Sequence, residues 1–155
     1  RSDYFIMKSK YFTTSPTQTK KLGENLAKNI LKIPLKGKAT ILGLEGDLGG
    51  GKTTFLQGFA RGLGIEDKIL SPTFVIMKNF KAQALSFERF YHIDCYRIKS
   101  SKEILNQGFK EILSNPKNII AIEWAERVQK IVPKNAIWIK FQFINEKTRK
   151  ITISS

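Results

Sequence analysis

The stretch that decides the fold is Gly46-Asp47-Leu48-Gly49-Gly50-Gly51-Lys52-Thr53. It matches the phosphate-binding pattern G-x-x-x-x-G-K-[ST], in which backbone N–H groups of a glycine-rich loop wrap the phosphates of a nucleotide. The helix that follows such a loop directs the positive end of its dipole at the same phosphates. The pattern predicts that Lys52 contacts the outer phosphate oxygens and that the Thr53 hydroxyl coordinates Mg²⁺. A glycine turn before an ordinary helix is the other interpretation.

The sequence on both sides of the loop favours the nucleotide-binding interpretation. Residues 39–45 are mainly apolar and predict a buried strand that enters the loop. After the loop, Phe55, Phe59 and Leu63 recur at helical spacing, and a glycine on each side of Leu63 can end the helix. The nucleotide-binding residues expected from the loop are Asp47, Leu48, Gly49, Gly50, Gly51, Lys52, Thr53 and Thr54.

The rest of the chain predicts an α/β fold with a mixed sheet. Leucine and isoleucine at four-residue spacing predict an amphipathic helix from Ser15 to about Pro34. A weaker helix over 101–113 is interrupted by Gly108, and a short one is expected over 125–132. Alternation on both sides of Asn145-Glu146 predicts a C-terminal antiparallel hairpin. Strands are also expected at 4–13, before Phe80, at 87–94 and at 118–124.

Composition limits the class of protein. With 155 residues and no repeat or linker, we expect one domain over 1–155, of which the first few residues need not be ordered. The net charge of +14 is dispersed, so it indicates either a solvated basic surface or a surface that attracts RNA as part of an assembly. No apolar run approaches the ~20 residues that cross a bilayer. The single cysteine, Cys95, cannot form an internal disulfide, and we expect a cytoplasmic protein without membrane contact.

Two carboxylates follow apolar strands. Glu123 comes after the run 119–122, where it is either a strand end that reaches water or an anchor for Mg²⁺; the phosphate loop upstream favours the anchor. Asp94 ends the strand over 87–94 and should lie at the same edge of the sheet. It could orient or deprotonate an attacking water, bind Mg²⁺ through water, or cap the next turn.

Other polar and aromatic residues give weaker signals. His92 shares a strand face with Asp94, but a structural role is the commoner one for a lone strand histidine. Thr73 lies in a Ser-Pro-Thr segment, which is either a common turn or a place where a hydroxyl senses the outer phosphate or Mg²⁺. Arg97 could pair with Asp94 or face a phosphate. Trp124 is expected to pack beside the site.

Four segments, in this order and spacing, resemble the TsaE (YjeE) family of small bacterial ATPases of tRNA threonylcarbamoyladenosine synthesis. They are Gly46–Phe55, Ser71-Pro72-Thr73-Phe74, His92-Ile93-Asp94-Cys95-Tyr96-Arg97 and Glu123-Trp124-Ala125-Glu126. The resemblance covers residues from about 15 to 153. Gly50 stands where the family usually has alanine, which only makes the loop more permissive.

The resemblance implies a P-loop NTPase core, three-layered with a mostly parallel sheet, that binds ATP with Mg²⁺. It implies Thr53 and Glu123 on the metal. It also implies Asp94 and Thr73 beside the γ-phosphate, where they and Lys52 form the catalytic set.

The same resemblance implies two peripheral contacts and two partners. Thr17, in the opening helix, would lie by the adenine, and Arg149, in the last hairpin, would approach the nucleotide. The partners are TsaD-like and TsaB-like proteins, of which TsaD transfers the threonylcarbamoyl group to adenosine 37 of tRNA. The TsaE protein hydrolyses ATP to drive or reset their complex and meets tRNA indirectly. We expect a monomer when free, with weak ATPase activity alone.

Two other function classes are kept as alternatives. A small P-loop nucleoside or nucleotide kinase would need a lid, an acceptor-binding insertion and an arginine cluster, but the six arginines are dispersed over 155 residues. A non-enzymatic RNA-binding module would need aromatic or basic residues gathered in one place. ATP hydrolysis stimulated by partner proteins would distinguish the ATPase from both.

Overall fold

The structure is a computed structural model, and it describes residues 8–46, 51–70, 76–83 and 86–155. Its helices are α1 (Pro16–Leu31), α2 (Lys52–Gly62), α3 (Lys102–Leu105), α4 (Phe109–Ser114) and the 3-10 helix η2 (Ala125–Ile131). Its strands are β1 (Ser9–Thr13), β2 (Thr40–Gly46), β3 (Met77–Lys81), β4 (Arg89–Asp94), β5 (Asn118–Glu123), β6 (Ile137–Phe143) and β7 (Arg149–Ser154).

The strands form a seven-stranded sheet in the order β1-β7-β6-β2-β5-β4-β3. The central strands β6, β2, β5 and β4 are mutually parallel. Strand β7 is antiparallel to both β6 and β1, so β1 runs in the same direction as the central strands. Only β3 and β7 run the other way among the described strands. The predicted mixed, mostly parallel sheet and its antiparallel C-terminal hairpin are confirmed.

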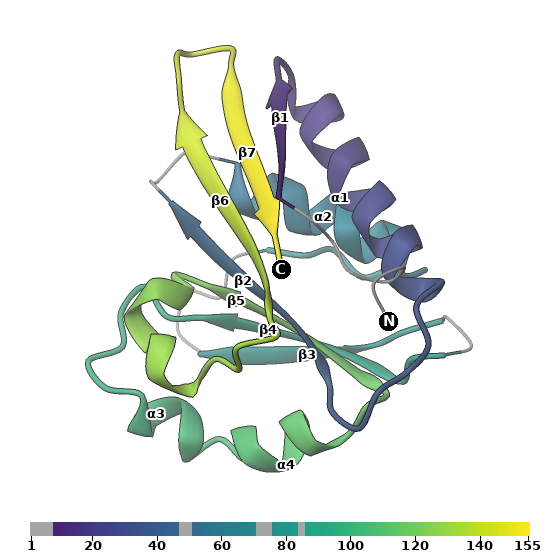
Figure 1. Cartoon of the computed structure of the whole chain (residues 1–155), viewed down its shortest axis with the longest axis vertical. Helices are drawn as coiled ribbons and strands as arrows, with labels where there is room; N and C mark the ends of the chain where they lie inside the picture. Colours follow the sequence, from purple (N-terminus) through teal and green to yellow (C-terminus); the bar gives the residue numbers. More distant parts are fainter. Residues whose placement is uncertain (1–7, 47–50, 71–75, 84–85) are drawn as a thin grey trace.

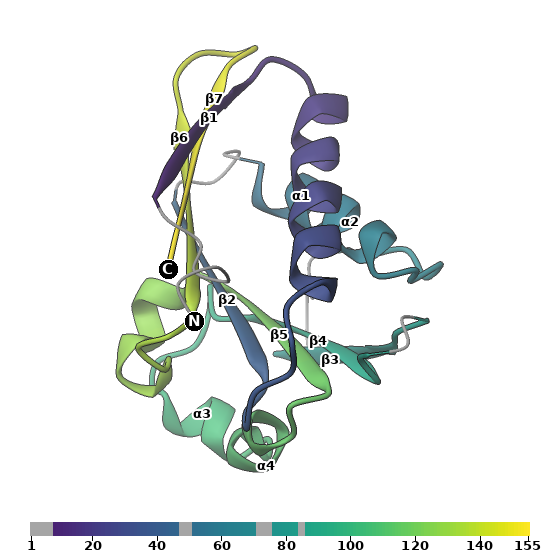
Figure 2. The same ribbon diagram turned by 45° about the vertical axis from the view of Figure 1, so that its right-hand side comes forward.

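Helices cover both faces of the sheet, as the two views of the ribbon show (Figures 1 and 2). Successive residues of a strand point to opposite faces. Leu42 and Leu44 of β2 therefore belong to the core under α1 and α2. Ile41 belongs to a second core, which contains residues of α3, α4 and η2. The predicted three-layer α/β arrangement is thereby confirmed.

Helices α1 and α2 pack with their backbones in contact. A Cβ atom at Gly58 would lie 1.9 Å from the carbonyl oxygen of Lys20, and one at Gly23 would lie 2.2 Å from the carbonyl oxygen of Phe55. Both separations are far shorter than a van der Waals contact, so only glycine fits at these positions. This close approach holds α1 beside α2, the helix that follows the phosphate loop.

The sequence-based expectations for the elements hold well. Ser15 caps α1 by accepting a hydrogen bond from the Gln18 N–H, with Pro16 in the first turn. The weak helix expected over 101–113 is two short helices, because Gly108 adopts φ +83° between them. The strand expected over 4–13 is observed as Ser9–Thr13, and residues 1–7 lie outside the described part.

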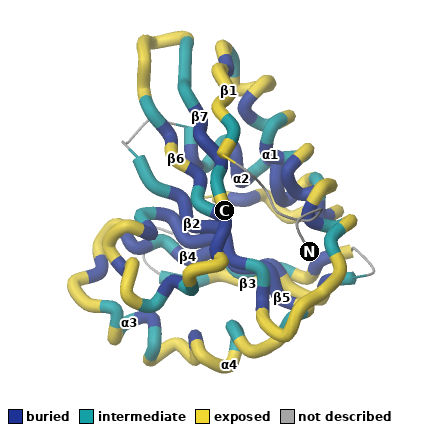
Figure 3. The backbone as a smooth tube through the Cα atoms, viewed as in Figure 1, coloured by how far each residue is buried: buried dark blue, intermediate teal, exposed yellow. Residues whose placement is uncertain are grey.

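Burial is uneven along the sheet (Figure 3). Every residue of β5 is buried, as expected for a central parallel strand covered on both faces. The turn of the β6–β7 hairpin, residues 144–147, is exposed. Within the described ranges, no helix is both long enough and apolar enough to cross a bilayer.

Candidate functional site

The phosphate loop is flanked by two glycines with a backbone conformation that side chains rarely adopt. Gly46 ends β2 with φ +133°, and a Cβ atom there would lie 2.1 Å from the carbonyl oxygen of Phe141. Gly51 precedes α2 with φ +99°. Gly51 has no side chain that could cap this end of α2, and the first turn of α2 contains no acidic residue, so its positive dipole end suits an anion.

Lys52, the loop lysine, is buried, with 6% of its surface exposed. Its ammonium donates a hydrogen bond to the Gly46 carbonyl oxygen at 2.7 Å, and its Nζ lies 4.5 Å from the centroid of the Trp124 ring. The charge is thus held between the start of the loop and an aromatic face, which attracts cations. A phosphate in the loop would offer this ammonium a stronger, charge-assisted partner.

Glu123 ends β5 beside the two strands that carry the other candidates. It lies opposite Leu44 of β2 on one side and opposite Asp94 of β4 on the other. Its Oε2 is 2.6 Å from His92 Nε2, and both side chains are buried. A buried carboxylate is costly unless it is hydrogen-bonded, so His92 stabilises Glu123 and fixes its orientation.

Asp94 lies at the same strand edge and is half-buried. Its Oδ1 accepts a hydrogen bond from the Tyr96 N–H at 3.0 Å, so the turn-capping interpretation is correct for this atom. Burial raises the pKa of the Asp94 carboxyl above its ordinary value, the Tyr96 N–H lowers it, and the nearby Glu123 charge raises it further. Lys52 and His92 oppose that rise, so these four ionisable groups share one neighbourhood.

Oxygen donors dominate the arrangement around the loop. Thr53 and Thr54 lie in the first turn of α2 and are partly exposed, and the Glu123 carboxylate lies at the neighbouring strand end. Hydroxyl and carboxylate oxygens, completed by phosphate oxygens and water, are the donors that Mg²⁺ prefers. The donor set therefore fits Mg²⁺ bound with a nucleotide. No cluster of three or more His, Cys, Asp or Glu side chains suited to a metal occurs in the described ranges.

The start of α1 lies against the loop. A Cβ atom at Gly51 would lie 3.5 Å from Thr19 Cγ2, an ordinary contact distance. The Thr19 hydroxyl is 2.7 Å from the Thr13 hydroxyl, which links this helix to β1. Thr17, the residue expected near the adenine, is exposed two positions before Thr19. Its contact with the base stays a prediction.

Arg149 begins β7 and lies opposite Thr13 of β1. Its guanidinium donates to the Asn145 carbonyl oxygen at 2.8 Å and lies 4.6 Å from the centroid of the Phe143 ring. Arg149 is therefore anchored to its own hairpin, although its backbone is close to the α1 start through Thr13. A contact with the nucleotide stays a prediction.

Several predicted site residues lie outside the described part of the chain, and their roles also stay predictions. They are Asp47, Leu48, Gly49, Gly50 and Thr73.

Trp124 packs beside Lys52 as expected, but the sequence did not predict that Tyr96 and Arg127 join it in a cluster. Trp124 adopts φ +59°, in the left-handed region that non-glycine residues rarely occupy. Its ring lies 5.1 Å from that of Tyr96, and the Arg127 guanidinium lies 5.1 Å from the Trp124 ring. Arg127 also donates a hydrogen bond to the Tyr96 carbonyl oxygen. Tyr96 and Trp124 closely follow Asp94 and Glu123, which were expected at one sheet edge, so the sequence did contain a signal for the contact between the two rings. It contained no such signal for Arg127.

Comparison with known proteins identifies the family of the chain. The family model described as "Threonylcarbamoyl adenosine biosynthesis protein TsaE" matches residues 13–151. The chain is similar to the tRNA threonylcarbamoyladenosine biosynthesis protein TsaE of Bacillus subtilis, with 34% identity over 94% of this chain and 85% of that protein. The protein of the same name from Rickettsia felis is 35% identical over 88% of this chain and 74% of its own length.

A solved structure shares the fold. The crystal structure of YdiB from Bacillus subtilis superposes with a TM-score of 0.70 at 29% sequence identity, covering 96% of this chain and 85% of that one. Because the family match and the relatives extend over most of the sequence, the chain belongs to the TsaE family of tRNA threonylcarbamoyladenosine biosynthesis proteins.

Proposed function

We propose that this protein is a Mg²⁺-dependent ATPase required for forming N6-threonylcarbamoyladenosine at position 37 of tRNA. In this proposal, ATP hydrolysis drives or resets a complex of TsaD-like and TsaB-like proteins, and the threonylcarbamoyl transfer occurs on the partner. The observation that supports it best is the buried Lys52 at the start of α2, whose ammonium lies over the ring of Trp124, the residue that follows Glu123. Family membership supplies the pathway.

The proposed binding step uses the loop and its lysine. Backbone N–H groups from Gly46 to Thr54 hold the phosphates, because the start of α2 carries the positive end of the helix dipole and its first turn has no acidic residue. The Lys52 ammonium exchanges the Gly46 carbonyl oxygen for phosphate oxygens. Thr17 and Arg149 contribute at the adenine and at the edge of the site.

The proposed metal ligands are the Thr53 hydroxyl and, directly or through water, the Glu123 carboxylate. Bound Mg²⁺ supplies charge that neutralises the phosphate oxygens during hydrolysis. His92 acts as a positioning residue, since its 2.6 Å hydrogen bond holds the Oε2 atom of Glu123.

Asp94 is proposed to orient the attacking water and accept its proton. Its half-buried position and raised pKa give a carboxylate more basic than one in water, which suits a general base. Thr73 is proposed to contact the outer phosphate, as switch residues of other nucleotide hydrolases do. Free protein is expected to be a cytoplasmic monomer with little turnover, because the complete arrangement depends on the partner complex.

The test compares ATP hydrolysis by the chain alone, with purified TsaD and TsaB proteins, and with nucleosides or nucleotides as phosphoryl acceptors. Stimulation by the partners, together with partner-dependent modification of tRNA, is the expected result. Phosphate transfer to an acceptor without any partner effect would instead identify a kinase.

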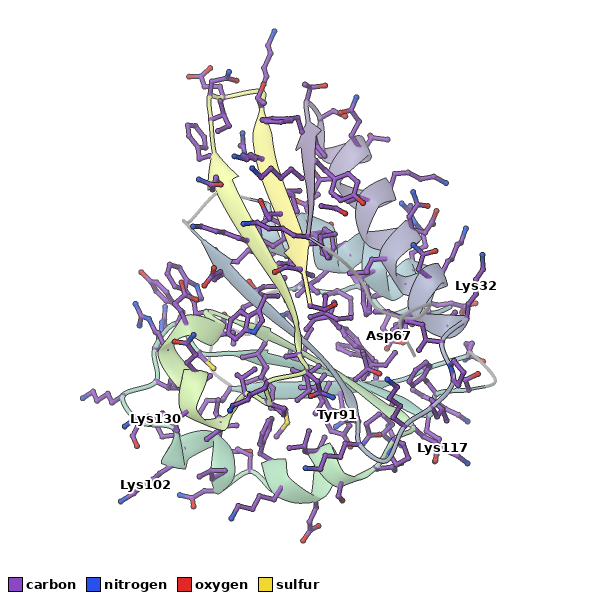
Figure 4. The ribbon with its side chains drawn as sticks, in the orientation of Figure 1. Lys32, Asp67, Tyr91, Lys102, Lys117 and Lys130 are labelled. Carbon is purple, nitrogen blue, oxygen red and sulfur yellow. The ribbon has the colours of Figure 1, made fainter. Side chains whose placement is uncertain are left out.

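Site variants make the test specific. Lys52→Ala and Glu123→Ala are expected to lower partner-stimulated turnover by at least about a hundredfold, by analogy with the loss of other electrostatic transition-state contacts. Lys130→Ala is the matched control, because Lys130 is exposed on η2 (Figure 4). Full Mg²⁺-dependent activity in both site variants would refute the assignment.

A further inference from the structure

A cavity of about 320 Å³ lies at the edge of the sheet opposite the phosphate loop. Its walls come from residues 30–41, which run from the end of α1 to the start of β2, from Phe87 before β4, from residues 134–137 at the start of β6, and from Ser155 after β7. Because β2 begins at this cavity and ends at Gly46, the two sites are separated by the length of the strand. The cavity is therefore distinct from the nucleotide site.

The interior of the cavity is largely apolar. Ile30, Phe87 and Ile137, from the core under α1 and α2, line it together with Ile41 from the core on the other face of the sheet. The cavity is thus a gap where the two cores meet at the end of the sheet. Leu35 also lines the cavity and is 40% exposed, so an apolar ligand that covered its side chain would remove apolar surface from water.

The rim of the cavity is positively charged. Lys36, Lys38 and Lys134 line it together with Ser155, the last residue of the sequence, and no aspartate or glutamate is among the described lining residues. All three lysines are exposed, and no ion pair is formed by them within the described ranges. Ammonium groups gathered at the mouth of an apolar cleft attract an anion, and their flexible stems let them reach it.

We propose that this cavity binds a small amphipathic carboxylate, with its hydrocarbon chain inside and its carboxylate on the rim lysines. Both parts of the ligand follow from the lining: the apolar walls select the chain, and the three unpaired ammonium groups select the anion. Ligand cavities start at about 300 Å³, so this one has room for a single medium-chain acid. The inference does not rest on the proposed ATPase function.

The experiment titrates octanoate into the ¹⁵N-labelled full chain and follows the amide resonances. Saturable one-to-one binding is expected, with a Kd on the order of 1 mM or below and shifts confined to residues that line the cavity. Octanol, which lacks the charge, and acetate, which lacks the chain, are each expected to bind at least about tenfold more weakly. Saturating octanoate is expected to leave nucleotide affinity unchanged.

Two matched double variants distinguish binding of octanoate in the cavity from non-specific attraction of an anion to a basic protein. Lys36→Gln/Lys134→Gln removes two rim charges, and Lys102→Gln/Lys130→Gln removes two exposed charges from α3 and η2 (Figure 4). The rim variant is expected to lose about tenfold in octanoate affinity and the control less than about twofold. Leu35→Ser, at an exposed position that should not disturb folding, is expected to weaken octanoate but not acetate.

Three results would overturn the proposal. They are the absence of saturable octanoate binding, equal weakening in the rim and control variants, and shifts centred on the phosphate loop. The proposal would also be refuted if the protein bound an acidic peptide but not octanoate, because the occupant of the cavity would then be a protein segment.

Discussion

His92 Nε2 lies 2.6 Å from Glu123 Oε2, across the parallel pairing of β4 and β5. The histidine is fully buried, and among the described residues its Nδ1 has no hydrogen-bond partner. A carboxylate oxygen accepts, so the His92 Nε2–H donates this bond and the carboxylate holds the ring. Glu123 is in turn the side chain proposed to bind Mg²⁺, so the histidine acts on the metal site through a second residue.

Replacing His92 tests this relationship. His92→Leu is expected to raise the Mg²⁺ concentration needed for nucleotide binding by about 10–100-fold, because Glu123 loses the donor that orients it. Loss of a buried partner should also lower the free energy of unfolding by about 1–3 kcal/mol. Mg²⁺ titrations of nucleotide affinity and urea unfolding measure the two effects.

His92→Gln is the control, since the glutamine amide can donate from a position close to that of Nε2. It should recover most of the Mg²⁺ affinity. An unchanged Mg²⁺ requirement in a folded His92→Leu protein would mean that the pair is structural only.

Because α1 and α2 are in backbone contact, a single methyl group added at Gly58 is expected to destabilise the protein. Gly58→Ala should lower the free energy of unfolding by about 1–3 kcal/mol, because the new Cβ would lie 1.9 Å from the Lys20 carbonyl oxygen. Helix propensity alone would give the opposite sign, with alanine favoured by about 1 kcal/mol. Urea unfolding decides between them. Gly37→Ala is the matched control, since nothing lies within 4 Å of its Cβ position, and it should change stability by less than about 0.5 kcal/mol.

Asp94 predicts a pH-dependent stability. Its pKa in the folded protein is raised above the ordinary value of 3.8, chiefly by burial, so the folded state binds the proton more tightly than the unfolded state. Stability therefore falls as the pH rises from about 3.8 through the raised pKa, and above that range the charged group carries a cost. Asp94→Asn keeps an oxygen acceptor for the Tyr96 N–H and removes the charge.

The Asp94→Asn variant should thus be more stable than the natural sequence near neutral pH and should lose ATPase activity. The gain in stability should shrink as the pH is lowered below 3.8, where Asp94 is protonated in both the folded and the unfolded protein. Thermal unfolding across that pH range measures the difference. A gain that does not change with pH would show that ionisation of Asp94 is not its cause.

The Cys95 thiol is expected to be unreactive toward alkylating reagents in the folded protein. The thiol is fully buried, and burial raises its pKa to about 12. At pH 8 the folded protein should therefore react with iodoacetamide far more slowly than the same chain in urea, as measured by mass spectrometry. Rapid alkylation without unfolding would contradict the burial of this residue.

The elements that the sequence predicted best depend on local chemistry. The break at Gly108, the cap at Ser15 and the apolar strand before Glu123 are all properties of neighbouring residues. The position of Asp94 beside Glu123 also followed, because parallel strands end at a common sheet edge. These signals were enough for the α/β class and for the main candidates of the site.

The features that escaped prediction depend on register between distant segments. His92 and Glu123 are 31 residues apart, and so are Tyr96 and Arg127, so their contacts arise only when the strands pair. The printed contacts of Arg149 with residues 143–148 are local ones that an alternating pattern cannot reveal, and its approach to the nucleotide stays a prediction. The cavity at the start of β2 likewise needs four separate stretches of the chain, namely 30–41, Phe87, 134–137 and Ser155, to form its walls.

The contact of Lys52 with Trp124 gives the protein an optical reporter of its own site. The ammonium lies 4.5 Å from the centroid of the indole ring, and a phosphate bound by Lys52 would change the charge beside that ring, so fluorescence of Trp124 should change when a nucleotide enters. The other tryptophan, Trp138, packs over Gly43 in the middle of β2 and should be insensitive. Nucleotide affinity, and its dependence on partner proteins, can therefore be followed in the unlabelled chain, with Trp138→Phe to isolate the signal.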